Sequence, residues 1–354
     1  FNVGSGFNRT VYSIIQQSDD KLVIGGGITN EIVRLNSDGT NDNSFKSYSN
    51  FYSGYFNNRN NIKFDFQSNG KMIVVGQFTS YNNQSFNRII RFNTDGSIDD
   101  SFDIGTGFNN AVYDIKVLAN DDIVLSGSFA SYNDTLSDGI IILNSDGNIK
   151  NVNSYNINTG FSLEIQSNGK IISVGNSHVL RFNQDLTIDT SFSNIDSAAN
   201  NTINQVEKLS DDKLILIGGF TTFRNISYNC MVKLNSDGTI DDTFNIGTGF
   251  SQRPNEINIQ SDDSIIVSMF NSSQTYKSEE IDSIFKIDKD GNKIETTHTI
   301  VSEDIVPVVF DSENVIVSSL SDSTFTHTLD SKTQSLISIE SSNISLKGIH
   351  TDYK

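Results

Sequence analysis

Residues 67–102 read QSNGKMIVVGQFTSYNNQSFNRIIRFNTDGSIDDSF, and this stretch decides the fold because most of the chain repeats it. A polar turn (residues 67–71) precedes a dense apolar run (residues 72–75), which is too short for a helix and rich in β-branched residues. Such runs are typical of strands buried on both faces. Asn69-Gly70 and Asp95-Gly96 supply the positive φ angles that hairpin corners require. The stretch therefore predicts a strand, a tight turn, a buried strand, a loop, a third strand, an Asp-Gly turn and a fourth strand.

The same unit recurs at intervals of about 43 to 52 residues, and no helical periodicity interrupts it. A fixed aromatic residue after the last strand predicts a wedge packed between neighbouring units. Short antiparallel strands in this number favour a closed ring over an open solenoid. We therefore predict an all-β fold, a β-propeller of about seven four-stranded antiparallel blades, with six or eight as the alternatives. The first turn begins at Ser18, Ser68, Asn120, Ser167, Ser210 and Ser261, and the fixed aromatic is Phe45, Phe102, Phe192 and Phe244.

The units together predict one propeller domain over residues 1–354. Because the chain starts at Phe1 without Met, we expect a processed product or a part of something longer. Residues 343–354 again resemble a first strand, which predicts either a latch that closes the ring or the start of a further unit.

The repeat resembles the delta-60 repeat β-propeller family. The resemblance lies in Gln67 to Lys71, Arg91 to Ser97, Asp99 to Phe102 and Gly218-Gly219-Phe220. It covers most of residues 1–300, weakens across residues 151–184 and nearly fails after residue 300. It implies a propeller of the kind found in bacterial secreted or surface proteins and in bacteriophage virion and tail proteins, with no catalytic residues to carry over.

Charge and cysteine content limit the partners. The formal net charge is -18 and the pI is about 4.5, so the chain repels phosphate backbones and anionic membrane surfaces, and we predict no nucleic-acid partner. No apolar stretch is long enough for a membrane helix, which predicts no membrane insertion. The single Cys230 cannot form an internal disulfide, and its apolar flanks predict a small buried residue.

Catalytic and metal motifs are scarce. His178, His298, His327 and His350 lie far apart in the sequence with no companion cysteines, so we predict no metal site and no cofactor. Calcium is the alternative at residues 93–100 and 235–242, where oxygen ligands surround a Gly turn, but no distal bidentate Glu completes a calcium loop. We interpret both stretches as turns. On these grounds the chain is predicted not to be an enzyme.

Candidate contact residues lie where the units differ. Residues 46–61 are longer than the matching segment 103–111 and carry aromatic side chains among Asn and Ser, which make an adaptable contact surface. Padding of the rim is the alternative role for these rings. In the loops between the second and third strands, Tyr81, Tyr132 and Phe223 align and are expected to be structural, whereas Leu136 fits the repeat less well and is a further candidate. The principal candidates are Phe51, Tyr52, Tyr55, Phe56, Phe86, Tyr228 and Tyr276.

The predicted function is a non-enzymatic binding or structural module of a bacteriophage virion or tail assembly, which contacts other virion proteins or attaches to a host surface. The first alternative is a secreted or cell-surface bacterial adhesion domain that binds glycan. A glycan-cleaving enzyme is the second alternative, and it requires two carboxylates that converge on one pocket. The expected location is therefore the virion, the cell surface or the extracellular space.

Overall fold

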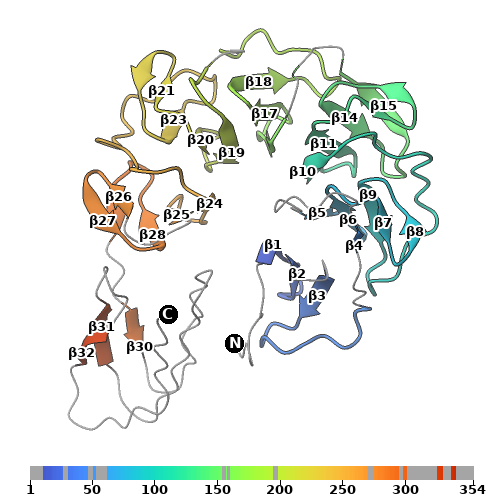
Figure 1. Cartoon of the computed structure of the whole chain (residues 1–354), viewed down its shortest axis with the longest axis horizontal. Helices are drawn as coiled ribbons and strands as arrows, with labels where there is room; N and C mark the ends of the chain where they lie inside the picture. Colours follow the sequence, from blue (N-terminus) through green and yellow to red (C-terminus); the bar gives the residue numbers. More distant parts are fainter. Residues whose placement is uncertain are drawn as a thin grey trace.

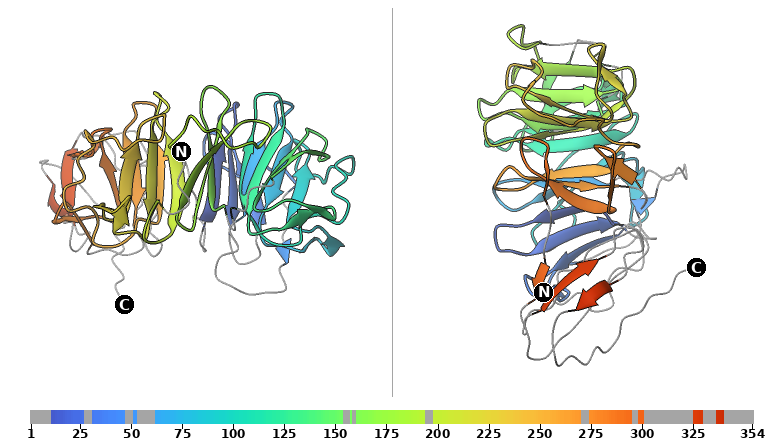
Figure 2. Two further views of the ribbon diagram at one scale, coloured as in Figure 1. Left: turned by 90° about the horizontal axis from the view of Figure 1, so that it is seen from above. Right: turned by 90° about the vertical axis from the view of Figure 1, so that its left-hand side faces the viewer.

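The structure, a computed structural model, describes residues 11–26, 31–46, 51–52, 62–153, 157, 160–193, 198–269, 274–294, 298–300, 325–329 and 336–339. Within these ranges every regular element is a strand, and none is a helix long and apolar enough to cross a membrane. The sheets follow one another around a central opening in chain order (Figure 1). Seen from the side, the ring is a disc and the strands run through its thickness (Figure 2). The predicted all-β propeller fold is confirmed.

Seven successive antiparallel sheets, called blades 1 to 7 here, make up the described ring. The total number of blades stays a prediction, because most of residues 301–354 lie outside the described ranges, as does the predicted latch. Blade 1 contains β1 (Val11–Gln16), β2 (Leu22–Gly26) and β3 (Glu31–Leu35); blade 2, β5 (Lys63–Phe66), β6 (Met72–Val75) and β9 (Ile89–Phe92); blade 3, β10 (Val112–Val117), β11 (Ile123–Gly127), β14 (Ile140–Leu143) and β15 (Ile149–Val152); blade 4, β16 (Ser162–Ile165), β17 (Ile171–Gly175) and β18 (His178–Phe182); blade 5, β19 (Ile203–Lys208), β20 (Leu214–Gly218) and β23 (Met231–Leu234); blade 6, β24 (Glu256–Ile259), β25 (Ile265–Ser268), β28 (Ile284–Ile287) and β29 (Lys293–Ile294); blade 7, β30 (His298–Ile300), β31 (Phe325–Leu329) and β32 (Leu336–Ile339).

Four blades also carry a short outer hairpin between their second and third strands. These outer hairpins are β7 (Ser80–Tyr81) with β8 (Gln84–Ser85), β12 (Ser131–Tyr132) with β13 (Thr135–Leu136), β21 (Thr222–Phe223) with β22 (Ile226–Ser227), and β26 (Gln274–Tyr276) with β27 (Glu279–Ile281). The remaining strand, β4 (Phe51–Tyr52), pairs with β7.

The prediction of a fourth strand in every blade is wrong. Blades 3 and 6 have one, whereas in blades 1, 2, 4 and 5 it is reduced to an isolated bridge such as Phe92↔Ile98. The cause lies at Asp99, whose carboxylate accepts hydrogen bonds from the backbone N–H and the hydroxyl of Ser101 and turns the chain out of the ladder. In blade 3 the same position holds Lys150, which cannot accept such bonds, and β15 continues there.

The hydrophobic core lies between the blades. The middle strands β6, β11, β17 and β20 are buried along their whole length, as strands covered on both faces must be. One cluster joins Ile73 and Val75 of blade 2 to Leu125 and Ile141 of blade 3. Each sheet thus buries its apolar side chains against the next blade rather than in one central core.

The repeated motif residues join each blade to the next. Arg91 donates from Nε to Asp99 Oδ2 at 2.6 Å and from Nη1 to the carbonyl oxygen of Ser145 in blade 3. Its guanidinium lies 4.3 Å from the ring centroid of Phe102. Phe102 packs against Gly147 of blade 3, where an added Cβ would be 2.8 Å from the ring. We call this arrangement the inter-blade clamp, and it confirms the predicted aromatic wedge.

The clamp recurs with the same geometry at other joints, so the motif is explained by assembly of the ring. The cation lies over the aromatic ring and forms an ion pair with the aspartate in each case. The matching sets are Arg34, Asp42 and Phe45 in blade 1; Arg181, Asp189 and Phe192 in blade 4; and Lys233, Asp241 and Phe244 in blade 5.

Candidate functional site

The outer hairpins present a rigid frame. In β12–β13, Asn133 and Asp134 have φ angles of 45° and 60°, the positive values of a type I′ turn. Tyr132 is buried beneath this turn, with its ring centroid 4.5 Å from that of Phe108, and its hydroxyl donates to the carbonyl oxygen of Gly147 at 2.9 Å. Burial raises the pKa of Tyr132, which therefore stays a neutral donor. The hairpin is thus fixed to its own blade.

The frame repeats while its exposed residues change. Both turn residues have positive φ angles in each of the four outer hairpins, and a buried aromatic precedes them. The two residues that follow the turn are exposed in every case and differ in charge and polarity: Gln84 and Ser85, Thr135 and Leu136, Ile226 and Ser227, Glu279 and Glu280. Leu136 is 78% exposed and Ile226 is 50% exposed. A constant frame with variable exposed residues is typical of the binding face of a repeat protein.

Two predicted contact residues belong to this frame and are corrected. Phe51 is only 4% exposed, and its ring centroid lies 4.5 Å from that of Tyr81. It follows Phe45 by six residues, as Phe108 follows Phe102, so it is the repeated aromatic and the extra residues come after it. The repeated six-residue spacing was the signal that could have shown this.

Tyr276 is the second correction, because it is 1% exposed and occupies the position of Tyr132. Its hydroxyl donates to the carbonyl oxygen of Gly291 at 2.7 Å, and its ring lies 4.7 Å from that of Phe250.

The other aromatic candidates remain predictions. Phe86 and Tyr228 occupy equivalent positions after their hairpins and are half-buried, packed against the clusters of two neighbouring blades. Tyr52 lies in β4. Tyr55 and Phe56 lie outside the described residues.

A group of charged side chains lies on the inner strands, and we call it the inner-strand ion cluster: Asp65 of β5, Asp114 and Lys116 of β10, Glu164 of β16 and Glu207 of β19. Lys116 Nζ lies 3.0 Å from Glu164 Oε2. Asp65 and Asp114 accept hydrogen bonds from the backbone N–H groups of the next blade's inner strand, at Val117 and Leu163, both at 2.7 Å. These carboxylates satisfy edge groups that no strand pairs with.

Burial and mutual charge perturb this cluster. Burial raises the pKa of Glu207 to about 7, although the nearby ammonium of Lys116 lowers it. Burial would lower the pKa of Lys116, but the carboxylates of Glu164, Asp114 and Glu207 raise it. The cluster was not predicted from the sequence, although charged residues within strands that face other blades were a signal of it. Titratable groups with perturbed pKa values close to a central opening are candidates for function. Ion networks that only stabilise a fold show the same pKa shifts, so these shifts do not by themselves assign a function to the cluster.

Four carboxylates of the calcium alternative, those of Asp95, Asp99, Asp237 and Asp241, are bonded to other groups of the protein. Asp237 Oδ1 accepts from the backbone N–H of Thr239 at 3.0 Å, and Asp241 pairs with Lys213 at 2.9 Å. No group of three or more His, Cys, Asp or Glu suited to a metal ion occurs among the described residues. Burial raises the pKa of the Cys230 thiol to about 11, so the thiol is protonated at neutral pH and is a weak nucleophile.

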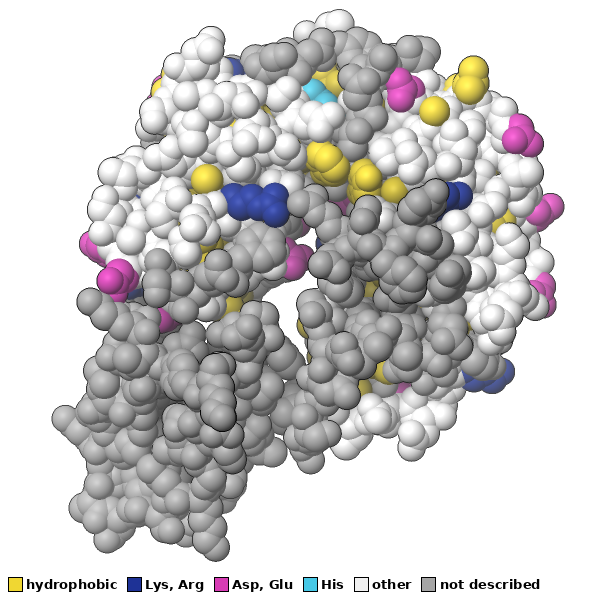
Figure 3. Space-filling model, viewed as in Figure 1, with side chains coloured by type: hydrophobic (Ala, Val, Ile, Leu, Met, Phe, Trp, Pro, Cys, Tyr) yellow, Lys and Arg dark blue, Asp and Glu magenta, His cyan; other side chains and the backbone are white. Residues whose placement is uncertain are grey.

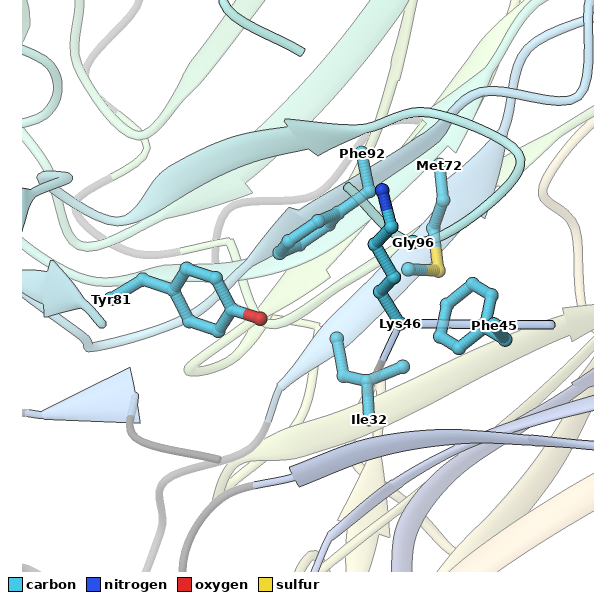
Figure 4. Close-up of a pocket in the computed structure, with 7 residues that line it drawn as sticks. All are labelled: Ile32, Phe45, Lys46, Met72, Tyr81, Phe92 and Gly96. Atoms are coloured by element: carbon cyan, nitrogen blue, oxygen red, sulfur yellow. The ribbon is translucent and has the colours of Figure 1, made fainter. Parts of the chain in front are cut away.

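A small crevice lies between blades 1 and 2, where the side chains of both blades meet (Figure 4). Its lining includes Phe45 and Gly96, the two sides of the clamp at this joint, together with Ile32, Lys46, Met72, Tyr81 and Phe92. It is therefore part of an inter-blade joint.

The units that carry the clamp match a known family of proteins. Four stretches, residues 17–45, 67–102, 166–192 and 209–244, match the family described as "Domain of unknown function (DUF5122) beta-propeller". These are the stretches of blades 1, 2, 4 and 5, which carry the Arg or Lys, Asp and Phe of the clamp. The chain is similar to this propeller family. The stretches that match this family thus contain the residues that join blades in this structure, and the narrower delta-60 family remains a resemblance.

No curated protein matches the chain. Among solved structures, virginiamycin B lyase from Staphylococcus aureus is 17% identical, with a TM-score of 0.50 over 89% of this chain and 90% of the lyase. A catalytically inactive variant of that lyase with quinupristin gives a TM-score of 0.52 at the same identity and coverage. A gluconolactonase from Xanthomonas campestris is 10% identical, with a TM-score of 0.46 over 74% of this chain and 84% of that chain.

The likeness to the lyase overturns our prediction that the chain is not an enzyme. That prediction relied on the fold and on the lack of catalytic motifs, and an enzyme shares this fold. At 17% identity the likeness shows the fold alone and assigns no reaction to this chain.

Proposed function

We propose that the protein is a binding scaffold in which the ring of blades holds the outer hairpins, and the exposed residues of these hairpins contact a partner protein. The observation that carries the proposal is the combination of an invariant hairpin frame with exposed residues that differ from blade to blade. A rigid frame lowers the entropic cost of binding, because the contact residues are already held in place. The variable residues then determine which partner fits.

The partner, in this proposal, is another protein of a bacteriophage virion or tail, or of a bacterial surface assembly. Support comes from the delta-60 resemblance and from the acidic, Asn- and Ser-rich composition. On the face shown in Figure 3, acidic side chains are spread around the ring rather than gathered in one patch. We therefore expect contacts through Leu136 and Ile226, which are exposed aliphatic side chains on the outer hairpins.

Photo-crosslinking in the native assembly tests the proposal. A photo-reactive amino acid is placed singly at position 136, at position 226 and, as the control, at Val152, which is 42% exposed on β15 and lies outside the hairpins. We expect adducts with another chain from positions 136 and 226 and none from position 152. Adducts from the control position alone, or equal yields from all three, would contradict the proposal.

A further inference from the structure

The joint between blades 3 and 4 is built differently from the four joints that carry the clamp. Ile142 stands where Arg91 stands in blade 2. Asn153 aligns with Phe102 in the sequence, but β15 carries it past the partner of Val152, so that its backbone N–H and Nδ2 donate to Ser137 Oγ and to the carbonyl oxygen of Asp138 of its own blade. On the receiving blade, Leu186 occupies the turn position that Gly147 occupies in blade 3. Both halves of this joint have therefore changed together.

Apolar packing replaces the clamp at this joint. Ile142 is 1% exposed and Leu186 is 5% exposed, and both belong to one buried cluster with Leu163 and Phe182 of blade 4. At the inner end, the joint is held by the Lys116–Glu164 ion pair. The missing guanidinium and aromatic ring are thus compensated by aliphatic side chains from both blades.

The backbone at Leu186 shows that its side chain has a role. Its φ angle is +63°, in the left-handed region that Gly adopts freely and that is costly for Leu. Gly occupies this position in blades 2, 3, 5 and 6. Leu is unfavourable for the backbone here, so its burial in the joint must offset that cost.

The two kinds of joint exclude each other sterically. At the clamp joints, a Cβ added at Gly96, Gly147, Gly238 or Gly291 would lie 3.1, 2.8, 2.6 or 3.2 Å from the facing Phe ring. A blade that carries this Phe therefore docks on a turn that carries Leu186 only if the ring moves away. Conversely, Asn153 is bonded to its own blade and presents no ring, so a Gly turn in place of Leu186 would leave unfilled space, which is costly in a packed joint.

We infer that the joint between blades 3 and 4 fixes the order of the blades, because neither half of it fits the corresponding half of a clamp joint. Similar repeats otherwise allow one blade to dock on the wrong neighbour, and misassembly and domain swapping are the characteristic failures of repeat proteins. A single mismatched joint within the ring distinguishes the correct order from a shifted one. This inference concerns assembly of the ring and is independent of the proposed binding function.

Thermal unfolding tests the steric part of the inference. We expect Leu186→Gly to lower the Tm by several degrees, because the lost packing exceeds the relief of backbone strain. A raised or unchanged Tm would overturn the inference, because it would mean that Leu186 is only tolerated. Gly147→Leu, the same exchange in reverse at a clamp joint, should lower the Tm by a larger amount.

Refolding tests the fixing of blade order. Leu186→Gly gives the turn of this joint the residue that the turns of its neighbours carry. After refolding from urea at increasing protein concentration, it should form several-fold more domain-swapped oligomer than the wild type, as measured by size-exclusion chromatography with light scattering. Oligomer yields equal to those of the wild type would overturn the inference.

Discussion

Replacing Glu207 with Gln should change how the stability of the ring depends on pH. Glu207 lies on β19 and accepts a hydrogen bond from Gln205 Nε2 at 2.9 Å. Burial raises its pKa from 4.5 to about 7. Gln has nearly the same shape and mimics the protonated acid, so the substitution removes the titration with little change in packing.

The sign follows from proton binding. Because the folded-state pKa is the higher one, the folded protein binds more protons than the unfolded chain between pH 4.5 and about 7. The wild type therefore loses stability as the pH rises through this window. At about 1.4 kcal/mol per pKa unit, the raised pKa corresponds to a loss of at most about 3 to 4 kcal/mol, which is complete about one pH unit above the folded-state pKa. Glu207→Gln should remove this loss. The free energy of unfolding of the variant minus that of the wild type should therefore be larger at pH 8 than at pH 4.5.

Urea unfolding at several pH values between 4 and 8 measures the effect, because the difference between variant and wild type cancels the titration of the groups that do not interact with Glu207. The matched control is Glu279→Gln, on the exposed hairpin strand β27, which should leave the pH dependence unchanged. If Glu207→Gln showed the same slope of stability against pH as the wild type, Glu207 would be solvated, and the proposed burial of the inner-strand ion cluster would be refuted.

Three further predictions concern the joints and turns. Gly238→Val should destabilise the fold by about 2 kcal/mol or more, because φ is +84° and an added Cβ would lie 2.6 Å from the Phe192 ring. Thermal melts measure the loss, with Gly219→Ala as the control, because a Cβ added at Gly219 has no neighbour closer than 3.5 Å. Equal losses of stability in both variants would contradict the clamp geometry. Arg91→Met should cost about 1 to 3 kcal/mol in urea unfolding, because the carboxylate of Asp99 loses its closest partner but keeps Lys71 at 2.7 Å, and a loss well below 1 kcal/mol would show that the pair contributes little. EDTA should leave the Tm unchanged, since the described carboxylates are engaged in turns and clamps; a drop that Ca²⁺ reverses would restore the calcium alternative.

The turns and buried strands could be predicted from the sequence because their causes are local. Asp-Gly and Asn-Gly corners need only the backbone freedom of the residues that form them, and an apolar run such as residues 72–75 needs burial on both faces wherever it lies. The fourth strand failed as a prediction for an equally local reason: the side chain of Asp99 accepts hydrogen bonds from Ser101 and ends the ladder after one bridge.

The candidate site was predicted less well, because exposure is not a local property. Phe51 stands among Asn and Ser, which suggested an exposed ring, yet the β4–β7 pairing places it against Tyr81. Lys116 and Glu164 are 48 residues apart and meet only because β10 and β16 are neighbouring inner strands. The spacing of two such residues along the sequence does not predict that they meet.

The sequence by itself determined the all-β fold, the turns and the wedge in the repeats that carry the fixed Phe, since all three depend on residue types at fixed intervals. Only the tertiary structure decided which repeated residues join neighbouring blades, which aromatics are buried, and that blade 3 meets blade 4 through Ile142 and Leu186 rather than through a clamp. The physical reason is that each joint is formed by side chains of two different units. The spacing of residues along the chain does not specify how these side chains share the space between the units.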